Sequence, residues 1–328
     1  MATNKSLSKR TPTNNLMLFS GRAHPTLAKE VAELLEVDCV PTTAYDFANG
    51  EIYVRFDESV RGCDAFVIQS HAAPINESIM EQLIMIDALK RASAKRITVV
   101  LPFYGYARQD KKHLGREPIS ARLMADLFLA AGADRLMTVD LHTAQIQGFF
   151  DGPVDHLLAM PILTRQVRKR YGKKPLAVVS PDAGRIKVAE QWARQFDNAP
   201  LAFIHKTRDV SKANVTKANR VVGEVAGRTC ILVDDLIDTG GTICQAAEAL
   251  MNDGAAEVVI AATHAVFSGE AIDKLKNSVA TEVIVTNTLP LADEHRFDKL
   301  TVLSIAPLLA QAVSAVFEDG SVTSLFSE

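Results

Sequence analysis

The chain has 328 residues, which is enough for two domains of about 150 residues that each bury their own core. It is 48% hydrophobic and 23% charged, as in an average soluble globular protein, and its formal net charge is −3. This charge argues against broad electrostatic attraction to nucleic acid or to an anionic membrane, so we expect particular loops to bind any phosphate group.

Neither the N-terminus nor the cysteines indicate an exported or membrane protein. Residues 1–15 are polar and weakly basic, they lack the apolar core of a secretory signal, and no apolar stretch of membrane-spanning length follows them. We interpret them as a flexible tail on a cytoplasmic protein. The four cysteines form no Cys-x-x-Cys pair, which indicates buried thiols rather than a disulfide framework.

Short apolar runs alternate with longer amphipathic segments through most of the chain. The runs predict strands at residues 16–19, 65–69, 97–101, 136–139, 176–179, 201–204, 230–233, 258–261 and 283–285. The amphipathic segments predict helices at residues 79–92, 121–131 and 243–252. Strands that alternate with helices at this spacing predict an α/β fold with mainly parallel sheets flanked by helices.

A weak internal repeat predicts that one α/β unit is used twice. Residues 87–89 and residues 248–250 both read Asp/Glu-Ala-Leu, and each tripeptide precedes an apolar strand at the same spacing. The strands at 65–69 and 230–234 also match in residue type. We therefore expect duplication of a domain, with the boundary near residues 153–161.

This boundary divides the chain into a tail and two domains. The N-terminal domain is expected at residues 16–157 and the C-terminal domain at residues 158–307. The C-terminal segment 308–328 is expected to complete the N-terminal domain.

Residues 231–242 carry the most specific local pattern. An apolar strand ends in Asp234 and Asp235, and a glycine-rich turn then opens a helix near Thr242. Glycines let the backbone approach a ligand closely, and the free N–H groups of a first helical turn favour phosphate. Carboxylates at the carboxyl end of a strand suit the hydroxyls of a ribose. The pattern predicts a ribose phosphate site rather than a simple capped helix start.

Three other groups of polar residues leave alternatives open. Arg108 fits a phosphate clamp as well as a surface salt bridge, and Gln109 beside it can read an adenine edge. A lone histidine after a strand, such as His142, is more often structural than functional. Residues 206–214 fit a mobile cationic loop over a site, but also an ordinary solvated loop.

The run from Asp234 to Thr242 resembles the phosphoribosyl-pyrophosphate loop of type I phosphoribosyltransferases. This resemblance implies that ribose 5-phosphate binds to Asp234, Asp235, Asp238, Thr239, Gly240, Gly241 and Thr242. The corresponding segment of the first repeat, residues 69–74, has neither an acidic pair nor a glycine pair. The sugar phosphate is therefore expected in the second domain.

Further segments resemble ribose-phosphate pyrophosphokinases in order from about residue 18 to residue 326. They are residues 47–51, 61–64, 106–111, 116–120, 140–142, 145–150, 180–182 and 287–288. The resemblance implies two tandem phosphoribosyltransferase type I-like domains. It also implies transfer of the β,γ-pyrophosphoryl group of Mg-ATP to the C1 hydroxyl of ribose 5-phosphate, which gives 5-phosphoribosyl 1-pyrophosphate and AMP for nucleotide, histidine and tryptophan biosynthesis.

The same resemblance implies roles for individual residues. ATP is expected at Phe47, Asn49, Gly50, Glu51, Arg108, Gln109 and Asp110. Mg²⁺ is expected at His142 and Asp182, and Lys206 and Arg208 are expected as catalytic cations, with Arg208 also contacting ribose 5-phosphate. A homo-oligomer built from dimers, commonly a hexamer, is implied as well, with loop 47–51 reaching a neighbouring subunit and inorganic phosphate acting as an activator.

The sequence departs from the family pattern in three places. Loop 206–214 is longer and less basic than in many relatives, Asn49 stands where an aspartate is common, and segment 180–184 lacks a double glycine. The second departure weakens the expectation of strictness for ATP. Two alternative functions remain, a phosphoribosyltransferase and a non-catalytic regulatory subunit. The first leaves Arg108 and Lys206 unexplained, and the second is expected to show interrupted motifs.

Overall fold

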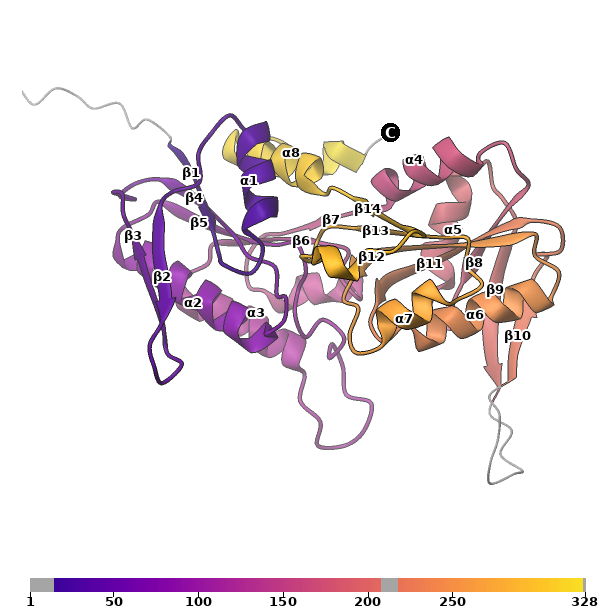
Figure 1. Cartoon of the computed structure of the whole chain (residues 1–328). Coiled ribbons are helices and arrows are strands. Elements are labelled where there is room, and N and C mark those ends of the chain that lie inside the picture. Colours follow the sequence, from indigo (N-terminus) through magenta and orange to yellow (C-terminus); the bar gives the residue numbers. More distant parts are fainter. Residues whose placement is uncertain (1–14, 208–217, 327–328) are drawn as a thin grey trace, which may run out of the picture.

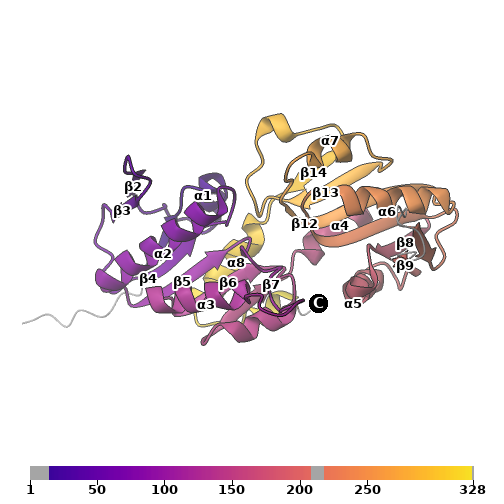
Figure 2. The ribbon, with the colours of Figure 1, turned by 90° about the horizontal axis from the view of Figure 1, so that it is seen from below.

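The computed structural model describes residues 15–207 and 218–326, which form two α/β halves. Each half is a sheet covered by helices on both faces, and the halves lie side by side (Figures 1 and 2). None of the helices in the described ranges is long and apolar enough to cross a membrane. The fold class predicted from the sequence is confirmed.

The first half contains a five-stranded parallel sheet in the order β1-β4-β5-β6-β7. A separate antiparallel hairpin, β2–β3, extends from it. The elements in chain order are β1 (Leu16–Ser20), α1 (Pro25–Leu34), β2 (Thr42–Asp46), β3 (Ile52–Phe56), β4 (Asp64–Ile68), α2 (Ile75–Arg91), β5 (Arg96–Leu101), α3 (Ser120–Ala131), β6 (Arg135–Val139), the 3-10 turn η1 (Ala144–Phe149) and β7 (Val154–Leu157).

The second half contains a seven-stranded sheet in the order β10-β9-β8-β11-β12-β13-β14, in which β10 is antiparallel to β9. The elements are α4 (Met160–Tyr171), β8 (Leu176–Ser180), η2 (Ala183–Arg185), α5 (Ile186–Arg194), β9 (Leu201–Thr207), β10 (Ala218–Val222), β11 (Thr229–Ile237), α6 (Gly241–Asn252), β12 (Glu257–Ala265), α7 (Ala271–Lys276), β13 (Glu282–Thr286), η3 (Asp293–His295), β14 (Leu300–Leu303), α8 (Ala306–Phe317) and η4 (Thr323–Phe326).

The strand orders confirm the predicted internal repeat. Strands β1, β4, β5, β6 and β7 occupy the same positions in their sheet as β8, β11, β12, β13 and β14 occupy in theirs. The β4-α2-β5 unit therefore corresponds to β11-α6-β12, as the matching tripeptides predicted. The halves differ in their hairpins, because β2–β3 stands apart whereas β9–β10 extends the main sheet.

The helix that follows each sheet packs against the other half. Helix α4 follows the first sheet but packs on β12 and β13, and α8 follows the second sheet but packs on α1 (Figure 1). A continuous apolar core under these helices includes Leu27, Leu163, Trp192 and Leu309. The division in which residues 308–328 complete the domain at 16–157 stays a prediction.

Strand β11 is longer than predicted, and this changes where the acidic pair lies. It pairs with β8 only from Thr229 to Leu232 but continues beside β12 as far as Ile237. Asp234 and Asp235 therefore lie inside the strand and not after its end, which corrects the prediction. The longer strand leaves one edge beyond Leu232 open to the loop after β8.

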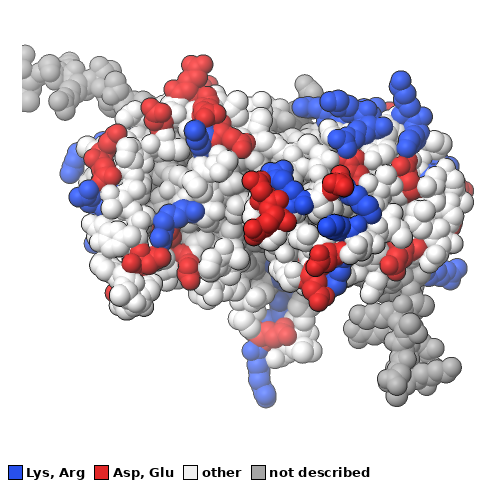
Figure 3. All heavy atoms as spheres, in the orientation of Figure 1, with Lys and Arg blue, Asp and Glu red and all other residues white. Residues whose placement is uncertain are grey.

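Charges of both signs lie on the face shown in Figure 3. Lys and Arg gather on one face over α4, whose last turn carries Arg168, Lys169 and Arg170 (Figure 3). The four cysteines are free, with Cys63 and Cys230 buried. Cys39 and Cys244 are only partly buried, so the prediction of buried thiols is wrong for these two.

Candidate active site

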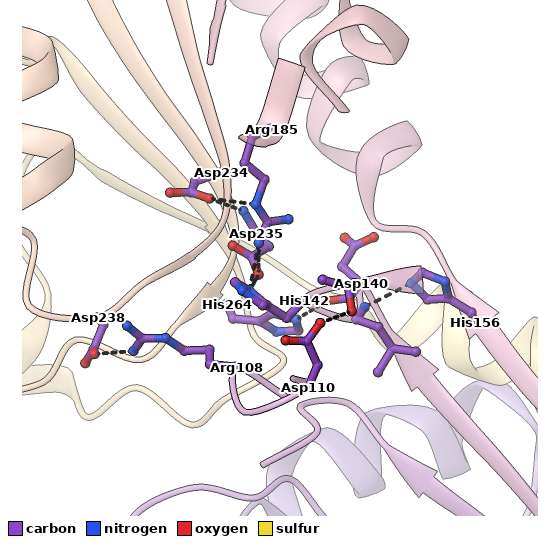
Figure 4. A network of polar contacts seen from close by, with 12 residues as sticks. Arg108, Asp110, Asp140, His142, His156, Arg185, Asp234, Asp235, Asp238 and His264 are labelled. Atoms are coloured by element: carbon purple, nitrogen blue, oxygen red, sulfur yellow. Dashed lines mark hydrogen bonds and ion pairs between the residues drawn. The ribbon is translucent and has the colours of Figure 1, made fainter. Parts of the chain in front are cut away.

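A pocket of about 240 Å³ lies where the loops after β8 and β11 meet the loops of the first half. Its wall joins nine residues predicted from the sequence, namely Arg108, His142, Asp182, Asp234, Asp235, Asp238, Thr239, Gly240 and Thr242. Arg185, Leu236, Ile237 and Ile243 complete the wall and were not predicted. Figure 4 shows its charged side chains converging from both halves.

The acidic pair is a largely buried part of the pocket wall. The Asp234 and Asp235 side chains are 20% and 7% exposed. Asp235 Oδ2 lies 2.7 Å from His142 Nδ1 and 2.5 Å from Arg185 Nη2, and Arg185 Nη2 lies 2.8 Å from the same His142 nitrogen (Figure 4). An acid of the second half, an arginine of the loop after β8 and a histidine of the first half thus meet at one point.

These contacts shift the pKa values of the two carboxyl groups in opposite directions. Burial and the charge of Asp235 raise the pKa of Asp234 well above its ordinary value. Burial also acts to raise the pKa of Asp235, but the hydrogen bond with His142 and the charge of Arg185 outweigh it and hold that pKa below the ordinary value. Asp235 is therefore the stably charged member of the pair.

The tautomer of His142 follows from the same contacts. Arg185 and Asp235 both lie within hydrogen-bond distance of Nδ1, which carries at most one proton. Because the charged carboxylate is the stronger acceptor, we assign the proton to Nδ1, so that both His142 and Arg185 donate to Asp235. The Nε2 lone pair then remains available to a ligand.

The loop that carries His142 is tied to the second half by Asp140. Its Oδ2 accepts hydrogen bonds from Thr263 Oγ1 at 2.5 Å and from the backbone of Ala159 at 3.1 Å. Its carbonyl lies 3.1 Å from Nε2 of His264, which is buried in β12. The position of His142 over the acidic pair is therefore fixed by buried polar contacts between the halves.

The glycine turn after β11 has the conformation that its sequence predicted. Gly240 has φ +74°, a left-handed conformation that favours glycine, and it precedes the first residue of α6, Gly241. The helix begins one residue earlier than expected. Thr239 and Thr242 are exposed in the pocket wall, so hydroxyls and the first N–H groups of α6 face the same space.

Arg108 reaches from the first half to this turn. Its Nη1 donates to Asp238 Oδ2 at 2.6 Å, and its side chain is 58% exposed. Burial acts to raise the pKa of Asp238, but hydrogen bonds with Ser268 and Arg108 outweigh it and hold the pKa below the ordinary value. Arg108 therefore forms the exposed salt bridge that one interpretation expected, and it also lines the pocket, where its role as a phosphate clamp stays a prediction.

The neighbours of Arg108 lie outside the pocket wall. Gln109 Oε1 accepts a hydrogen bond from Ser120 Oγ at 2.6 Å, at the first residue of α3. Asp110 is buried, and its Oδ2 accepts from Thr143 Oγ1 at 2.7 Å, one residue after His142. In this structure both side chains hold loops in place.

The predicted nucleotide loop of residues 47–51 also lies away from the pocket, at the tip of the β2–β3 hairpin (Figure 1). Its turn is closed by a backbone hydrogen bond of 2.8 Å between Phe47 and Glu51, and Gly50 has φ +88°. Asn49 Oδ1 accepts from the backbone N–H of Glu51 at 3.2 Å. The Phe47 side chain is 47% exposed and packs edge-on against Tyr45.

The two predicted catalytic cations cannot be placed. Lys206 belongs to β9, but its side chain lies outside the described residues, as does the whole of Arg208. Loop 206–214, which was expected to be mobile, falls almost entirely in the same gap.

The two residues expected for magnesium, His142 and Asp182, both line the pocket. Among the residues that the structure describes, no three His, Cys, Asp or Glu side chains form a cluster that could hold a metal. Asp182 Oδ1 accepts from the backbone N–H of Gly184 at 2.8 Å, which orients the carboxylate at the pocket wall. Magnesium keeps several waters and takes few protein ligands, so one carboxylate with substrate phosphates is sufficient.

Comparison with known families agrees with this geometry. Residues 16–132 match the family model for the N-terminal domain of ribose phosphate pyrophosphokinase. Residues 200–327 match the model for the phosphoribosyl synthetase-associated domain.

Individual relatives match over nearly the whole chain. The chain is 65% identical over 320 residues to the ribose-phosphate pyrophosphokinase of Streptomyces avermitilis, covering 98% of both chains. It is 65% identical over 312 residues to that of Mycobacterium tuberculosis, covering 95% of this chain and 96% of the other. The solved phosphoribosylpyrophosphate synthetase of Mycobacterium smegmatis superposes with a TM-score of 0.90 at 64% identity, covering 94% of this chain and 100% of that one.

Two tandem α/β repeats share one pocket, whose wall carries one acidic pair and one glycine turn. The chain belongs to the ribose-phosphate pyrophosphokinase family. It is accordingly an ATP-dependent enzyme of nucleotide biosynthesis, with ATP and ribose 5-phosphate as substrates. Relatives of this name at 65% identity over full length decide against both the phosphoribosyltransferase and the regulatory-subunit alternatives.

Proposed function

We propose that this pocket binds ribose 5-phosphate and presents its C1 hydroxyl to the β-phosphorus of ATP. The observation that carries the proposal is that the acidic pair of β11, the turn before α6 and Arg108 of the other half line one pocket. The phosphate would lie on Asp238, Thr239, Gly240, Gly241 and Thr242, where hydroxyls and helix N–H groups face it. The ribose hydroxyls would donate to Asp234 and Asp235.

ATP would enter from the side of the first half, next to Arg108. Because loop 47–51 is remote from the pocket of its own chain, its exposed Phe47 ring is suited to the nucleotide in the site of a second copy. The proposal therefore includes a homo-oligomer built from dimers, with a hexamer as the expected assembly. Gln109 and Asp110 would support Arg108, since their side chains hold α3 and the His142 loop.

Mg²⁺ would be held at the pocket by Asp182 and by Nε2 of His142, directly or through water, and when bound it would neutralise charge on the substrate phosphates. The cations Lys206 and Arg208, which lie outside the described residues, would stabilise charge on the transferred group. No described residue in the pocket is an obvious general base. The C1 oxygen would form its bond to the β-phosphorus as the bond from that phosphorus to the bridging oxygen of AMP breaks, and the hydroxyl proton would pass to water. Positioning would therefore carry most of the catalysis.

The setting of the reaction is also part of the proposal. We expect a cytoplasmic enzyme that is activated by inorganic phosphate and that binds neither nucleic acid nor a membrane.

Phosphorus NMR of the purified protein with ATP, ribose 5-phosphate, Mg²⁺ and inorganic phosphate tests the reaction. The expected products are AMP and a pyrophosphorylated ribose in equal amounts, and chelation of Mg²⁺ should stop their formation. ADP with a singly phosphorylated sugar would mean an ordinary kinase. No turnover despite nucleotide binding would contradict the proposal and favour a regulatory role.

A further inference from the structure

Arg185 occupies the centre of the pocket although the sequence assigned it no role. It is the last residue of the short turn η2 and directly precedes α5. Its side chain is only 15% exposed and points from the second half toward the His142 loop of the first (Figure 4). The side chain is therefore committed to the pocket and not to solvent.

The guanidinium group touches three polar side chains. Nη2 lies 2.5 Å from Asp235 Oδ2 and 2.8 Å from His142 Nδ1, and Nε lies 3.8 Å from Asp234 Oδ1. Asp234 in turn accepts the backbone N–H of Asp235 at 2.9 Å. One arginine thus pairs with both carboxylates of β11, and Asp235 links it to the histidine that crosses from the first half.

This arrangement has an electrostatic cost that a fixed cation offsets. Two adjacent carboxylates in a largely buried position repel one another, and a buried charge without a partner is strongly unfavourable. A guanidinium group is always charged, and its planar fork holds several acceptors in a fixed geometry. Arg185 therefore sets the direction in which the free oxygens of the acidic pair point.

A comparison within α5 separates this role from ordinary surface pairing. Arg194, at the other end of the helix, pairs with Glu190 at 2.8 Å with side-chain exposures of 65% and 53%. Such an exposed ion pair contributes little to the stability of the fold. Arg185 belongs to the same segment but is largely buried among residues that line the pocket.

We propose that Arg185 is a positioning residue for ribose 5-phosphate, which fixes Asp235 and His142 in the arrangement that the ribose hydroxyls meet. This inference rests on the proposed function, since it takes the pocket as the sugar phosphate site. Arg185 acts through the acidic pair, so its removal should affect the binding of ribose 5-phosphate far more than the binding of ATP.

Isothermal titration of the full chain with ribose 5-phosphate alone, and with ATP alone, tests this role. Arg185→Ala should raise the Kd for ribose 5-phosphate about 10- to 100-fold, the range expected for losing charged hydrogen bonds, and should raise the Kd for ATP less than about threefold. Arg185→Lys, which keeps the charge but not the fork, should fall between Arg185→Ala and the wild type. Arg194→Ala is the matched control and should change neither Kd by more than about twofold.

A double-mutant cycle tests whether Arg185 acts through the acid. Asp235→Asn alone should weaken ribose 5-phosphate binding, and adding Arg185→Ala to it should weaken binding much less than Arg185→Ala weakens the wild type. If Arg185→Ala does not fold, Arg185→Lys replaces it in the cycle. Fully additive effects, or a wild-type Kd in Arg185→Ala, would overturn the positioning role alone. Failure of the wild type to bind ribose 5-phosphate would overturn the proposed function as well.

Discussion

Substitution of the two glycines at the start of α6 by alanine should have opposite effects on stability. Gly240 has φ +74°, so alanine there must adopt a left-handed conformation. Its Cβ would meet Ala271 O at 3.4 Å, an ordinary contact, so the conformation and not a clash sets the cost. Gly241 begins the helix, and a Cβ there would meet no atom within 4 Å.

The magnitudes follow from these conformations. A left-handed alanine costs about 1–2 kcal/mol, so Gly240→Ala should lower the free energy of unfolding by that amount. Alanine at a compatible helical position restricts the unfolded chain, so Gly241→Ala should raise the free energy of unfolding by about 0.4–1 kcal/mol. The two variants, one residue apart, should therefore differ by about 1.4–3 kcal/mol.

Urea denaturation of the two variants and the wild type measures this difference, and titration with ribose 5-phosphate follows the consequence for binding. Gly240→Ala should also bind the sugar phosphate more weakly, because the turn that presents the first N–H groups of α6 is distorted. Equal stability of the two variants, or a stabilised Gly240→Ala, would refute the positive φ on which the site depends.

Three further predictions test packing, pH dependence and the contact between halves. Leu309→Ala, in the α8 core, should lower the free energy of unfolding by about 2–5 kcal/mol in urea, and a loss below about 1 kcal/mol would contradict the helix exchange. Burial lowers the pKa of His71 to about 4, so between about pH 6.5 and 4 the unfolded chain binds a proton that the folded chain does not. The contribution of His71 to the free energy of unfolding should be complete above pH 6.5 and should decrease toward pH 4 by up to about 1.4 kcal/mol per pH unit. If the free energy of unfolding of His71→Gln decreases with pH as steeply as that of the wild type, His71 is not the cause. Arg108→Ala should change the free energy of unfolding by less than about 1 kcal/mol, because the ion pair of Arg108 with Asp238 is exposed. The same variant should lower turnover at least about tenfold in an AMP-release assay. Unchanged turnover would show that Arg108 is not part of the active site.

The sequence was sufficient for strands with an apolar centre. Strands β4 and β12 are buried almost from end to end, and their apolar runs predicted them, although β12 extends beyond the predicted residues 258–261 to Ala265. Helices α5 and α8 were not predicted. Helix α5 is short and strongly amphipathic. Helix α8 is apolar over most of its length, so its sequence lacks the alternation of apolar and polar residues that predicts a helix. The packing of α8 on α1 depends on tertiary contacts, which local sequence patterns do not reveal.

The candidate site was predictable where chemistry and local conformation coincide. The run from Asp234 to Thr242 holds its pocket-lining groups within one continuous stretch of sequence, so a local pattern was enough to predict it. Arg185 was missed because its partners come from β11 and from the loop after β6, far away in sequence. The sequence did contain one indication, because Arg185 directly follows segment 180–184 and so belongs to the same loop as Asp182.

A crystal structure of the protein with ribose 5-phosphate tests the central claim most directly. We predict that the phosphate lies at the N-terminus of α6 against Thr239 and Thr242, with two ribose hydroxyls on Asp234 and Asp235 and with Arg185 still bound to Asp235. A sugar phosphate bound away from α6, or with its phosphate turned toward Asp182, would contradict the assignment of this pocket.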